Sequence, residues 1–346
     1  MVRLLRSIRV STVAAAIGLA VGVYALLAQL SGLRSTARAL LDGSPVALGA
    51  MGGLETVSLM AYGFLTRTAL GVDRDTLSEW HLQKTVLVGT GLGRVMPGGT
   101  VGALAVTVRA LAGPGRPGLV VATTLAAAGF VSSAVLFVLM ILAVVPLLVA
   151  GTLAGRILAI ATAAAIFAVL TAAVFTPAMV WPDKVGMLTT RVVKLLAHGP
   201  LRRLDPLSLG DQVTHAARRG SHLFRDPAKR GHSLLWATVN WVADMGVLLV
   251  AAYGFGGGEQ ALLSAPLAYV LSQAAAALPT TPGGVGVVEG VAAAVLAAGG
   301  VSAAEATAAV LAWRLISHWL PIAVGLALLP TLRPESTEDV RAVRGD

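Results

Sequence analysis

The stretch LPTTPGGVGVVEG, residues 278–290, interrupts an apolar region with two prolines, four glycines and one glutamate. A residue that precedes proline is displaced from helical geometry, so one helix is predicted to end at Leu278–Pro279. Apolar residues resume after the glycines. We therefore expect region 265–298 to form a broken-helix hairpin, with its first helix opening near Pro266. Each arm would have about 14 residues, or about 21 Å, which is too short to cross a hydrocarbon layer of about 30 Å.

The whole chain has the composition of a membrane protein. Of its 346 residues, 56% are hydrophobic and 12% are charged. Apolar runs of about 20 residues recur, a length that is typical of membrane-spanning helices. The alternating pattern of barrel strands is absent, and lipid permits only helices or closed barrels. The predicted fold class is all-α, a polytopic helical membrane bundle.

A counterpart of the first break occurs earlier, at PGGTVG, residues 97–102. In region 77–111, Thr76 and Glu79 have the spacing of a capping box, which predicts a helix that begins near Leu77. This helix is expected to end before the proline of the motif, and a short helix follows. The sequence thus predicts two broken-helix hairpins.

The distribution of charge suggests a topology. Lys and Arg accumulate on the cytoplasmic side of membrane proteins, so we expect the basic N-terminus and the basic stretch 182–232 to be cytoplasmic. If both hairpins are re-entrant, they enter from opposite faces, and the C-terminus is also cytoplasmic. Full-length spans are expected at 10–32, 46–66, 117–149, 154–180, 233–253 and 304–330.

Four parts of the chain follow from this topology. They are an N-terminal membrane half (1–181), a cytoplasmic basic linker (182–232), a C-terminal membrane half (233–332) and a cytoplasmic tail (333–346). Each half places a span before a PGG break, a short helix and another span. Because the halves have opposite orientation, we expect an inverted repeat, which is a common plan of transporters.

The linker carries most of the excess positive charge. The chain has a net charge of +9, and residues 182–232 hold ten Lys and Arg against four Asp. A nucleic-acid-binding protein would also be basic, but this excess lies beside spans, so no nucleic-acid partner is expected. Within 184–196, apolar residues at helical spacing alternate with Lys184, Arg191 and Lys194. This pattern predicts an amphipathic helix that lies on the membrane and contacts anionic lipid head groups, or one that packs under the bundle.

Both breaks are candidate anion sites. The helix that restarts after each PGG directs its N-terminal N–H groups and positive dipole end towards the break, which attracts anions such as phosphate. Glycines allow a head group to approach the backbone closely. The alternative is that each PGG is only the tight turn of a re-entrant loop. The candidate substrate-binding residues at the breaks are Pro97, Gly98, Gly99, Pro282, Gly283, Gly284 and Gly286.

Ionisable residues within spans are a second group of candidates, because they usually face a partner or an aqueous path. Arg94 would place a positive charge beside a break. Glu289, expected two turns into the second arm, would pair with Arg314. The alternative is that such a pair only joins two helices, and that Lys84 only extends its ammonium group to the interface. The full set is Glu55, Lys84, Arg94, Asp244, Glu289, Arg314 and His318.

Several kinds of site are not expected. Cysteine is absent, which excludes disulfides, thiolate metal sites and cysteine nucleophiles. The histidines of the linker lack the spacing of a metal site. The motif GTGLGR (89–94) resembles a nucleotide loop but lacks a preceding strand, and small residues for close helix contact are the better interpretation. We expect no catalytic, metal or cofactor site.

The second half resembles the lysylphosphatidylglycerol synthase transmembrane-region family, also called flippase-like. The resemblance rests on LSQAAAALPTTPGGVGVVEG (271–290), on the last span with its arginine, and on LLWATVNWVADMGVLLVAAYGFG before them. The first motif departs from the family pattern, because Ala103 stands where an acidic residue is usual. The matching positions are Asn240, Asp244, Gln273, Pro279, Pro282, Gly283, Gly284, Gly286, Glu289, Arg314, Pro321 and Gly325.

The resemblance implies movement of aminoacylated phosphatidylglycerol, or of another lipid-linked product, across the plasma membrane. In full-length synthases an aminoacyl-transferring domain follows the membrane part, whereas this chain ends at Asp346, so we expect no enzyme activity. The leading prediction is a flippase or transporter of a phospholipid or lipid-linked precursor in the cytoplasmic membrane. The alternatives are a secondary transporter of a small solute or ion, and a non-transporting accessory of a membrane synthase or glycosyltransferase.

Overall fold

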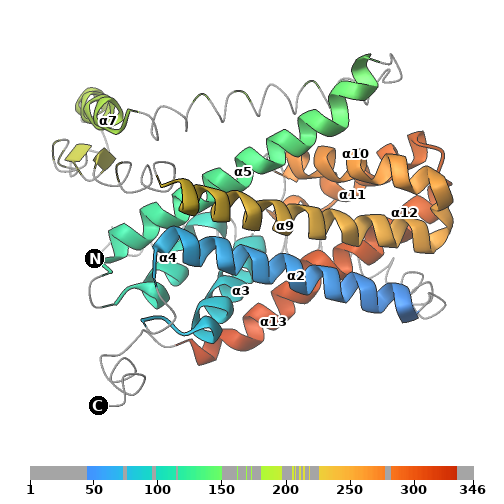
Figure 1. Cartoon of the computed structure of the whole chain (residues 1–346), viewed down its shortest axis with the longest axis horizontal. Coiled ribbons are helices and arrows are strands. Elements are labelled where there is room, and N and C mark those ends of the chain that lie inside the picture. Colours follow the sequence, from blue (N-terminus) through green and yellow to red (C-terminus); the bar gives the residue numbers. More distant parts are fainter. Residues whose placement is uncertain are drawn as a thin grey trace, which may run out of the picture. The chain divides into compact units, whose positions relative to one another are not determined.

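The structure is a computed structural model of the whole chain. It describes residues 45–72, 76–95, 99–113, 116–149, 181–196, 226–276 and 282–332, with scattered positions between 162 and 218. All regular elements among these residues are helical (Figure 1), which confirms the predicted all-α class.

The described residues form ten α-helices. In chain order they are α2 (Pro45–Leu70), α3 (Glu79–Val95), α4 (Gly99–Leu111), α5 (Gly118–Val149), α7 (Pro182–Leu196), α9 (Pro227–Ala252), α10 (Gly258–Ala276), α11 (Val287–Ala298), α12 (Ala303–Arg314) and α13 (Leu320–Leu328). Two π-helical turns, η2 (Tyr253–Gly257) and η4 (Leu315–Trp319), and two 3-10 turns, η3 (Pro282–Gly284) and η5 (Leu329–Thr331), complete the described elements.

Four described segments are long and apolar enough to cross a membrane, and they confirm four predicted spans. They are Pro45–Leu70, Gly118–Val145, Pro227–Ala276 and Ala303–Thr331. The third passes through η2, where Phe255 and Gly256 leave helical geometry, so α9 and α10 are separate helices. The predicted span 10–32 and the tail lie outside the described residues, as does nearly all of the span at 154–180.

The chain divides into two compact units. Unit 1 contains Met1–Glu55, Leu87–Ala105 and Asp244–Pro330, and unit 2 contains Thr56–Val86, Val106–Ala243 and Thr331–Asp346. The division falls within α2, α3, α4 and α9, so each of these helices contributes residues to both units. All candidate residues at the two breaks belong to unit 1.

The first broken region has the predicted order of two helices. α3 ends at Val95 and α4 begins at Gly99, and the predicted stop at Met96–Pro97 lies outside the described residues. The helix predicted to begin near Leu77 is confirmed, with its first residue two positions later, at Glu79. Glu79 forms a 2.9 Å ion pair with Arg67 of α2, and this contact fixes the beginning of α3 within unit 2.

The second broken region differs from the prediction at its start. α10 begins at Gly258 rather than near Pro266, and it contains Pro266 in its interior. Its 19 residues correspond to about 28 Å, which is longer than the predicted arm and close to the thickness of a hydrocarbon layer. Proline is tolerated within membrane helices because neighbouring groups satisfy the freed carbonyl. α11, with 12 residues, is about 18 Å long and remains a short arm.

The core of unit 1 is a packed group of three helices. α10 packs against α11, and α11 packs against α12 (Figure 1). Their large apolar side chains are fully buried, as Tyr269, Leu296 and Trp313 illustrate. Ser302 caps α12 by accepting a hydrogen bond from the Glu305 N–H, which stabilises the turn between α11 and α12.

Glycines allow α3 and α13 to approach at backbone distance within unit 1. A Cβ atom added to Gly91 would lie 3.1 Å from the Pro321 carbonyl oxygen, and one added to Gly325 would lie 2.7 Å from the Leu87 carbonyl oxygen. This is the close contact that small residues permit between membrane helices. It confirms the packing interpretation of GTGLGR.

Unit 2 has its own buried contacts. Leu65, Val131 and Ala237 bring α2, α5 and α9 together in one apolar cluster. Asn240 of α9 donates hydrogen bonds to the backbone oxygen and to the hydroxyl of Ser58 on α2, at 3.0 and 2.9 Å. The Lys84 ammonium group donates to the Thr331 carbonyl oxygen at 3.0 Å, so it binds the end of a helix.

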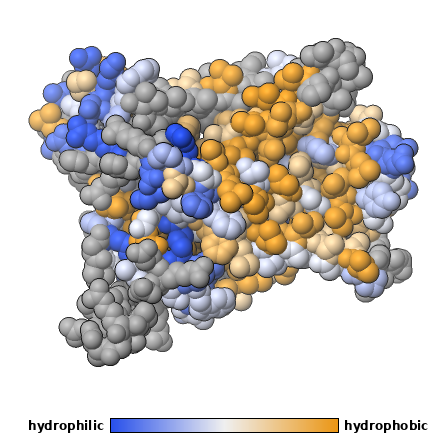
Figure 2. Space-filling model, viewed as in Figure 1, coloured by the Kyte–Doolittle hydropathy of each residue, from blue (hydrophilic) through white to orange (hydrophobic). Residues whose placement is uncertain are grey.

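The amphipathic helix predicted at 184–196 is present as α7 in unit 2. One face is close-packed, since a Cβ atom on Gly186 would lie 2.8 Å from the Gly210 carbonyl oxygen. Leu188, Val192 and Leu195 on another face are 59%, 42% and 76% exposed. Figure 2 shows mostly hydrophilic residues over α7, with a few apolar ones among them.

Candidate functional site

Glu289 lies at the N-terminus of α11 and uses its two carboxylate oxygens for different contacts. Oε2 accepts a 2.7 Å hydrogen bond from the Gly286 N–H, so the Glu289 side chain caps the N-terminus of α11. Glu289 is therefore the third residue of the helix, and the prediction that it lies two turns into the arm is wrong. The helix begins late because the left-handed glycines extend the turn to Gly286. The carboxylate itself occupies this helix end, where negative charge is favoured.

Arg314 forms the predicted pair with Glu289. Its Nε donates to Glu289 Oε1 at 2.6 Å, and its Nη2 donates to the Gly283 carbonyl oxygen at 3.1 Å. Both side chains are largely buried, at 8% and 14% exposed. The guanidinium thus joins α12 both to α11 and to the turn that precedes it.

The turn itself requires glycine. Gly283, Gly284 and Gly286 have φ values of 64°, 69° and 87°, a region that other residues rarely adopt. A Cβ atom on Gly283 would lie 2.8 Å from the Arg94 carbonyl oxygen and 3.0 Å from Cε1 of His318. The end of α3 and the turn η4 therefore meet the second break at Gly283.

Arg94 contacts only backbone oxygens. In the last turn of α3, its Nη1 donates to the Ser317 carbonyl oxygen at 2.6 Å and to that of His318 at 3.4 Å. A π-helical turn leaves carbonyl groups available for such contacts. Among the described residues, no carboxylate lies within ion-pair distance of Arg94. In the described part of the chain its positive charge therefore has no ion-pair partner, and it interacts electrostatically with the carboxyl groups of Glu55 and Asp244.

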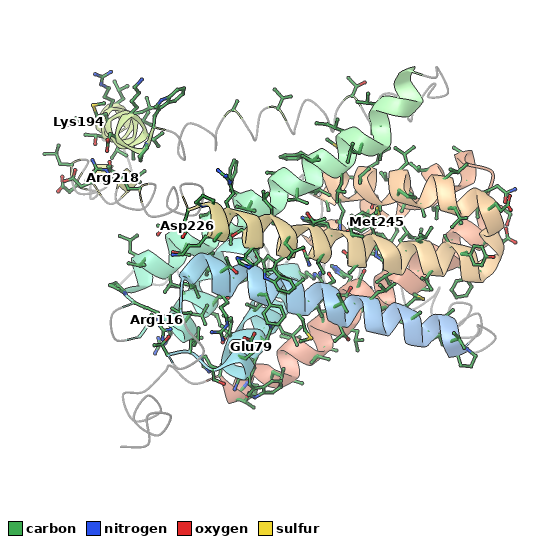
Figure 3. All side chains as sticks on the ribbon, in the orientation of Figure 1. Glu79, Arg116, Lys194, Arg218, Asp226 and Met245 are labelled. Carbon is green, nitrogen blue, oxygen red and sulfur yellow. The ribbon has the colours of Figure 1, made fainter. Side chains whose placement is uncertain are left out.

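Asp244 is the acceptor of a hydrogen-bond network in unit 1. Oδ2 accepts from the Tyr269 hydroxyl at 2.8 Å, and Oδ1 accepts from the Trp313 indole N–H at 3.1 Å. The Gln273 amide donates to the Tyr269 oxygen at 3.0 Å and lies 3.4 Å from Oδ2. Met245, the next residue, marks this level of α9 in Figure 3. The network fixes Asp244 between α9, α10 and α12.

Two further ionisable side chains are deeply buried. Glu55 on α2 is 4% exposed and His318 on η4 is 3% exposed. Glu55 Oε2 and His318 Nε2 have no hydrogen-bond partner in the described part of the chain. Arg314 and His318 both contact Gly283, so they share one face as their spacing predicted.

The structure thus brings many of the predicted residues together. Arg94, Gly283 and Arg314 are direct neighbours, and Glu289 joins them through Arg314. Of the first PGG, Pro97 and Gly98 lie outside the described residues, and Gly99 is described only as the first residue of α4. Pro282, Gly284 and Gly286 form the second turn.

Sequence reasoning missed Tyr269 and Trp313 as partners of Asp244. Two signals were available: Trp313 immediately precedes Arg314, and Tyr269 lies four residues before Gln273, which places them on one helix face. A rare polar aromatic residue in a span usually seeks a hydrogen-bond partner when buried. The partner itself follows only from the packing of three helices.

Comparison with known proteins identifies the family. A family model described as lysylphosphatidylglycerol synthase TM region matches residues 9–325. The chain belongs to this family. Neither a curated protein nor a solved structure matched it in the two other comparisons. Family membership and the four apolar helices together identify a membrane protein.

In this chain, the basic side chains of Arg314 and His318 and the backbone of Arg94 lie next to Gly283. Among the described residues, no group of three or more His, Asp or Glu side chains is arranged to hold a metal ion. Two arginines and two carboxyl groups, those of Glu289 and Asp244, instead form an ion pair and hydrogen bonds within unit 1. Buried charges of both signs suit a ligand that itself carries charge.

Proposed function

We propose that this member of the lysylphosphatidylglycerol synthase TM region family moves a phospholipid or lipid-linked precursor across the cytoplasmic membrane and has no enzymatic activity. In this proposal the cluster around Gly283 receives the charged head group. The two broken helices are re-entrant hairpins of an inverted repeat, and both chain termini face the cytoplasm. The match to the family and the chemistry of the cluster support the proposal.

The observation that carries the proposal is the environment of Arg94. Among the described residues, its guanidinium donates hydrogen bonds to the carbonyl oxygens of Ser317 and His318 alone, beside the turn at Gly283. A partly buried cation without a paired anion is costly. The phosphate of a lipid supplies the missing charge, and arginine binds phosphate oxygens in a fixed geometry.

The neighbouring residues suit the rest of a head group. Arg314 is already neutralised by Glu289, so the positive charge available to a ligand comes from Arg94. Asp244 lies in the same unit and accepts hydrogen bonds through both of its carboxyl oxygens, so it would suit a head group with an amine beside its phosphate. A ligand with apolar chains would leave those chains in the surrounding lipid, whereas a free solute would need an aqueous path.

Transport by Arg94→Gln tests the proposal. In proteoliposomes with fluorescent lipids and a reductant outside, wild-type protein is expected to expose inner-leaflet lipid to reduction. The variant would lose the hydrogen bond between the guanidinium and the lipid phosphate, and a hydrogen bond to a charged group contributes about 1.5–3 kcal/mol. The transport rate of the variant is therefore expected to be about tenfold to hundredfold lower. Arg109→Gln on α4 is the matched control, because Arg109 is an exposed arginine and is expected to keep the wild-type rate.

The alternatives give different results in the same assay. If lipids move no faster with the protein than in empty liposomes, over several phospholipids and lipid-linked sugars, the proposal is wrong. Uptake of a soluble solute would then indicate a secondary transporter. Equal rates for Arg94→Gln and Arg109→Gln would leave lipid movement in place but remove Arg94 from the site.

We also assign α7 to the membrane surface. Its exposed Leu188, Val192 and Leu195 lie beside Arg191 on one side of the helix, the arrangement of a helix that rests in the interface of an anionic bilayer. Each basic residue near such a surface contributes about 1 kcal/mol. Asp183, the acidic residue of α7, pairs with Arg218, which is labelled with Lys194 in Figure 3.

Site-specific labelling tests this assignment, because the chain has no cysteine. An environment-sensitive dye at Leu195→Cys is expected to report an apolar environment in vesicles that contain phosphatidylglycerol, and a more polar one in neutral vesicles. The matched control, Asp183→Cys at another exposed position of α7, is expected to remain in water. The same spectrum at both positions would contradict a membrane-bound apolar face.

A further inference from the structure

Glu55 is the buried group that the proposed head-group site leaves unexplained. It lies in the middle of α2, is 4% exposed, and its Oε2 atom has no hydrogen-bond partner among the residues that the structure describes. An ionised carboxylate that is buried without donors is costly. A proton or another small cation that binds to the Glu55 carboxyl group would remove this cost.

The register of α2 and α9 places Asp244 beside Glu55. A Cβ atom on Gly246 would lie 3.2 Å from Leu54 Cδ1 in unit 1. One turn further along the same helices, Ser58 bonds to Asn240. The two helices therefore run antiparallel in contact, and Glu55 faces the level of Asp244. Electrostatic interactions of Glu55 with Asp244 and Arg94 agree with this placement.

The two carboxyl groups differ in how they are held. Asp244 accepts hydrogen bonds from Tyr269 and Trp313, and these donors fix its negative charge. Glu55 lacks a donor on Oε2. Repulsion between neighbouring buried carboxylates disfavours two negative charges, so the pair is suited to one fixed charge and one group that takes up a proton.

We propose that Glu55 is the group that exchanges a proton between the two sides of the membrane and so couples lipid movement to the proton gradient. The inference rests on the proposed function. When the site opens to one side, Glu55 Oε2 takes a proton from water and forms a neutral carboxylic acid. When the site opens to the other side, the O–H bond breaks and the proton leaves to water.

The surrounding groups explain how a lipid would act on this exchange. The charged and titratable groups that face Glu55 are Asp244 of α9, Arg94 at the end of α3 and Tyr269 of α10. A phosphate on Arg94 would neutralise the cation that favours an ionised Glu55. Binding of the lipid and binding of the proton are therefore expected to favour each other.

A proton fits this site better than a metal ion. Calcium and magnesium require about six or more oxygen ligands, whereas no described group of three acidic or histidine side chains is arranged for a metal. A proton needs only the one unpartnered oxygen of Glu55.

Proteoliposomes with a pH gradient test the proposal. A gradient of about one pH unit is a tenfold ratio of proton concentrations, or about 1.4 kcal/mol. If one proton moves with each lipid, this gradient can drive up to about a tenfold ratio of lipid between the two leaflets. Wild-type protein is expected to show this asymmetry, and Glu55→Gln is expected to lose it. Glu259→Gln, the same substitution at an exposed position of α10, is expected to keep it.

An infrared measurement on the purified protein reads the proton directly and does not require transport. Wild-type protein is expected to show a carboxylic-acid C=O band that changes with pH and is absent from Glu55→Gln. Lipid movement in the wild type with no response to the pH gradient would overturn the coupling while leaving the proposed function intact. A band that is unchanged in Glu55→Gln would overturn the assignment to Glu55. A response to sodium in place of protons would also overturn it.

Discussion

Replacement of Arg314 by methionine is expected to destabilise the protein by about 3–5 kcal/mol, the range for breaking a buried ion pair by removal of one partner. The substitution keeps an unbranched chain of similar length up to the guanidinium but removes both contacts of that group, to Glu289 and to the Gly283 carbonyl oxygen. It leaves a largely buried carboxylate without its cation. Thermal unfolding in detergent, followed by tryptophan fluorescence, measures the loss.

A double variant separates the charge from the packing. In Glu289→Gln/Arg314→Met both charges are absent, and the glutamine oxygen can still accept from the Gly286 N–H that Glu289 now caps. Because the two residues are in contact, their effects are not additive, and the double variant is expected to be less destabilised than the sum of the single variants. Arg109→Met at an exposed position is the matched control. Additive losses would contradict the ion pair.

Replacement of Gly283 by alanine is expected to have the second largest effect. Its φ of 64° costs an alanine about 1–2 kcal/mol. The new Cβ atom would also lie 2.8 Å from the Arg94 carbonyl oxygen, and such overpacking adds about 1–3 kcal/mol. Lipid movement is expected to fall as well, because the clash would displace the end of α3 and with it Arg94.

Two other glycines provide a matched series. Gly286 has a φ of 87° but no neighbour within 4 Å of an added Cβ atom, so Gly286→Ala is expected to lose only the conformational part of about 1–2 kcal/mol. Gly290 lies within α11 and also has no neighbour there, so Gly290→Ala is expected to be neutral or to stabilise the helix by up to about 1 kcal/mol. Equal unfolding temperatures for Gly283→Ala and Gly286→Ala would show that no contact exists at Gly283.

The parts of the fold that were predictable follow from the cost of exposing polar groups to lipid. Apolar length alone predicted the four spans that the structure describes. Proline predicted that each of the two regions is divided into separate helices, as α3 and α4 and as α10 and α11 are, whereas the predicted stops at Met96–Pro97 and Leu278–Pro279 lie outside the described residues. The start of α10 was missed because Pro266 was interpreted as a first-turn residue, whereas it lies inside the helix.

The ion pair of the candidate site was predictable from the sequence. Glu289 and Arg314 carry opposite charges within apolar segments, so their pairing followed from the sequence. The position of Glu289 within α11 could not be predicted, because the turn continues through Gly286, which has a positive φ, before the helix begins. The partners of Asp244 depend on how α9, α10 and α12 pack, and no pattern within one helix specifies that packing.

The central claim is that the cluster around Gly283 binds the phosphate of a lipid through Arg94. Mass spectrometry of the lipids that co-purify with the protein tests it most directly. We predict that wild-type protein and Arg109→Gln retain the same phosphate-bearing lipid after extensive washing in detergent, and that Arg94→Gln loses it. Identical lipids in identical amounts in all three preparations would contradict the account.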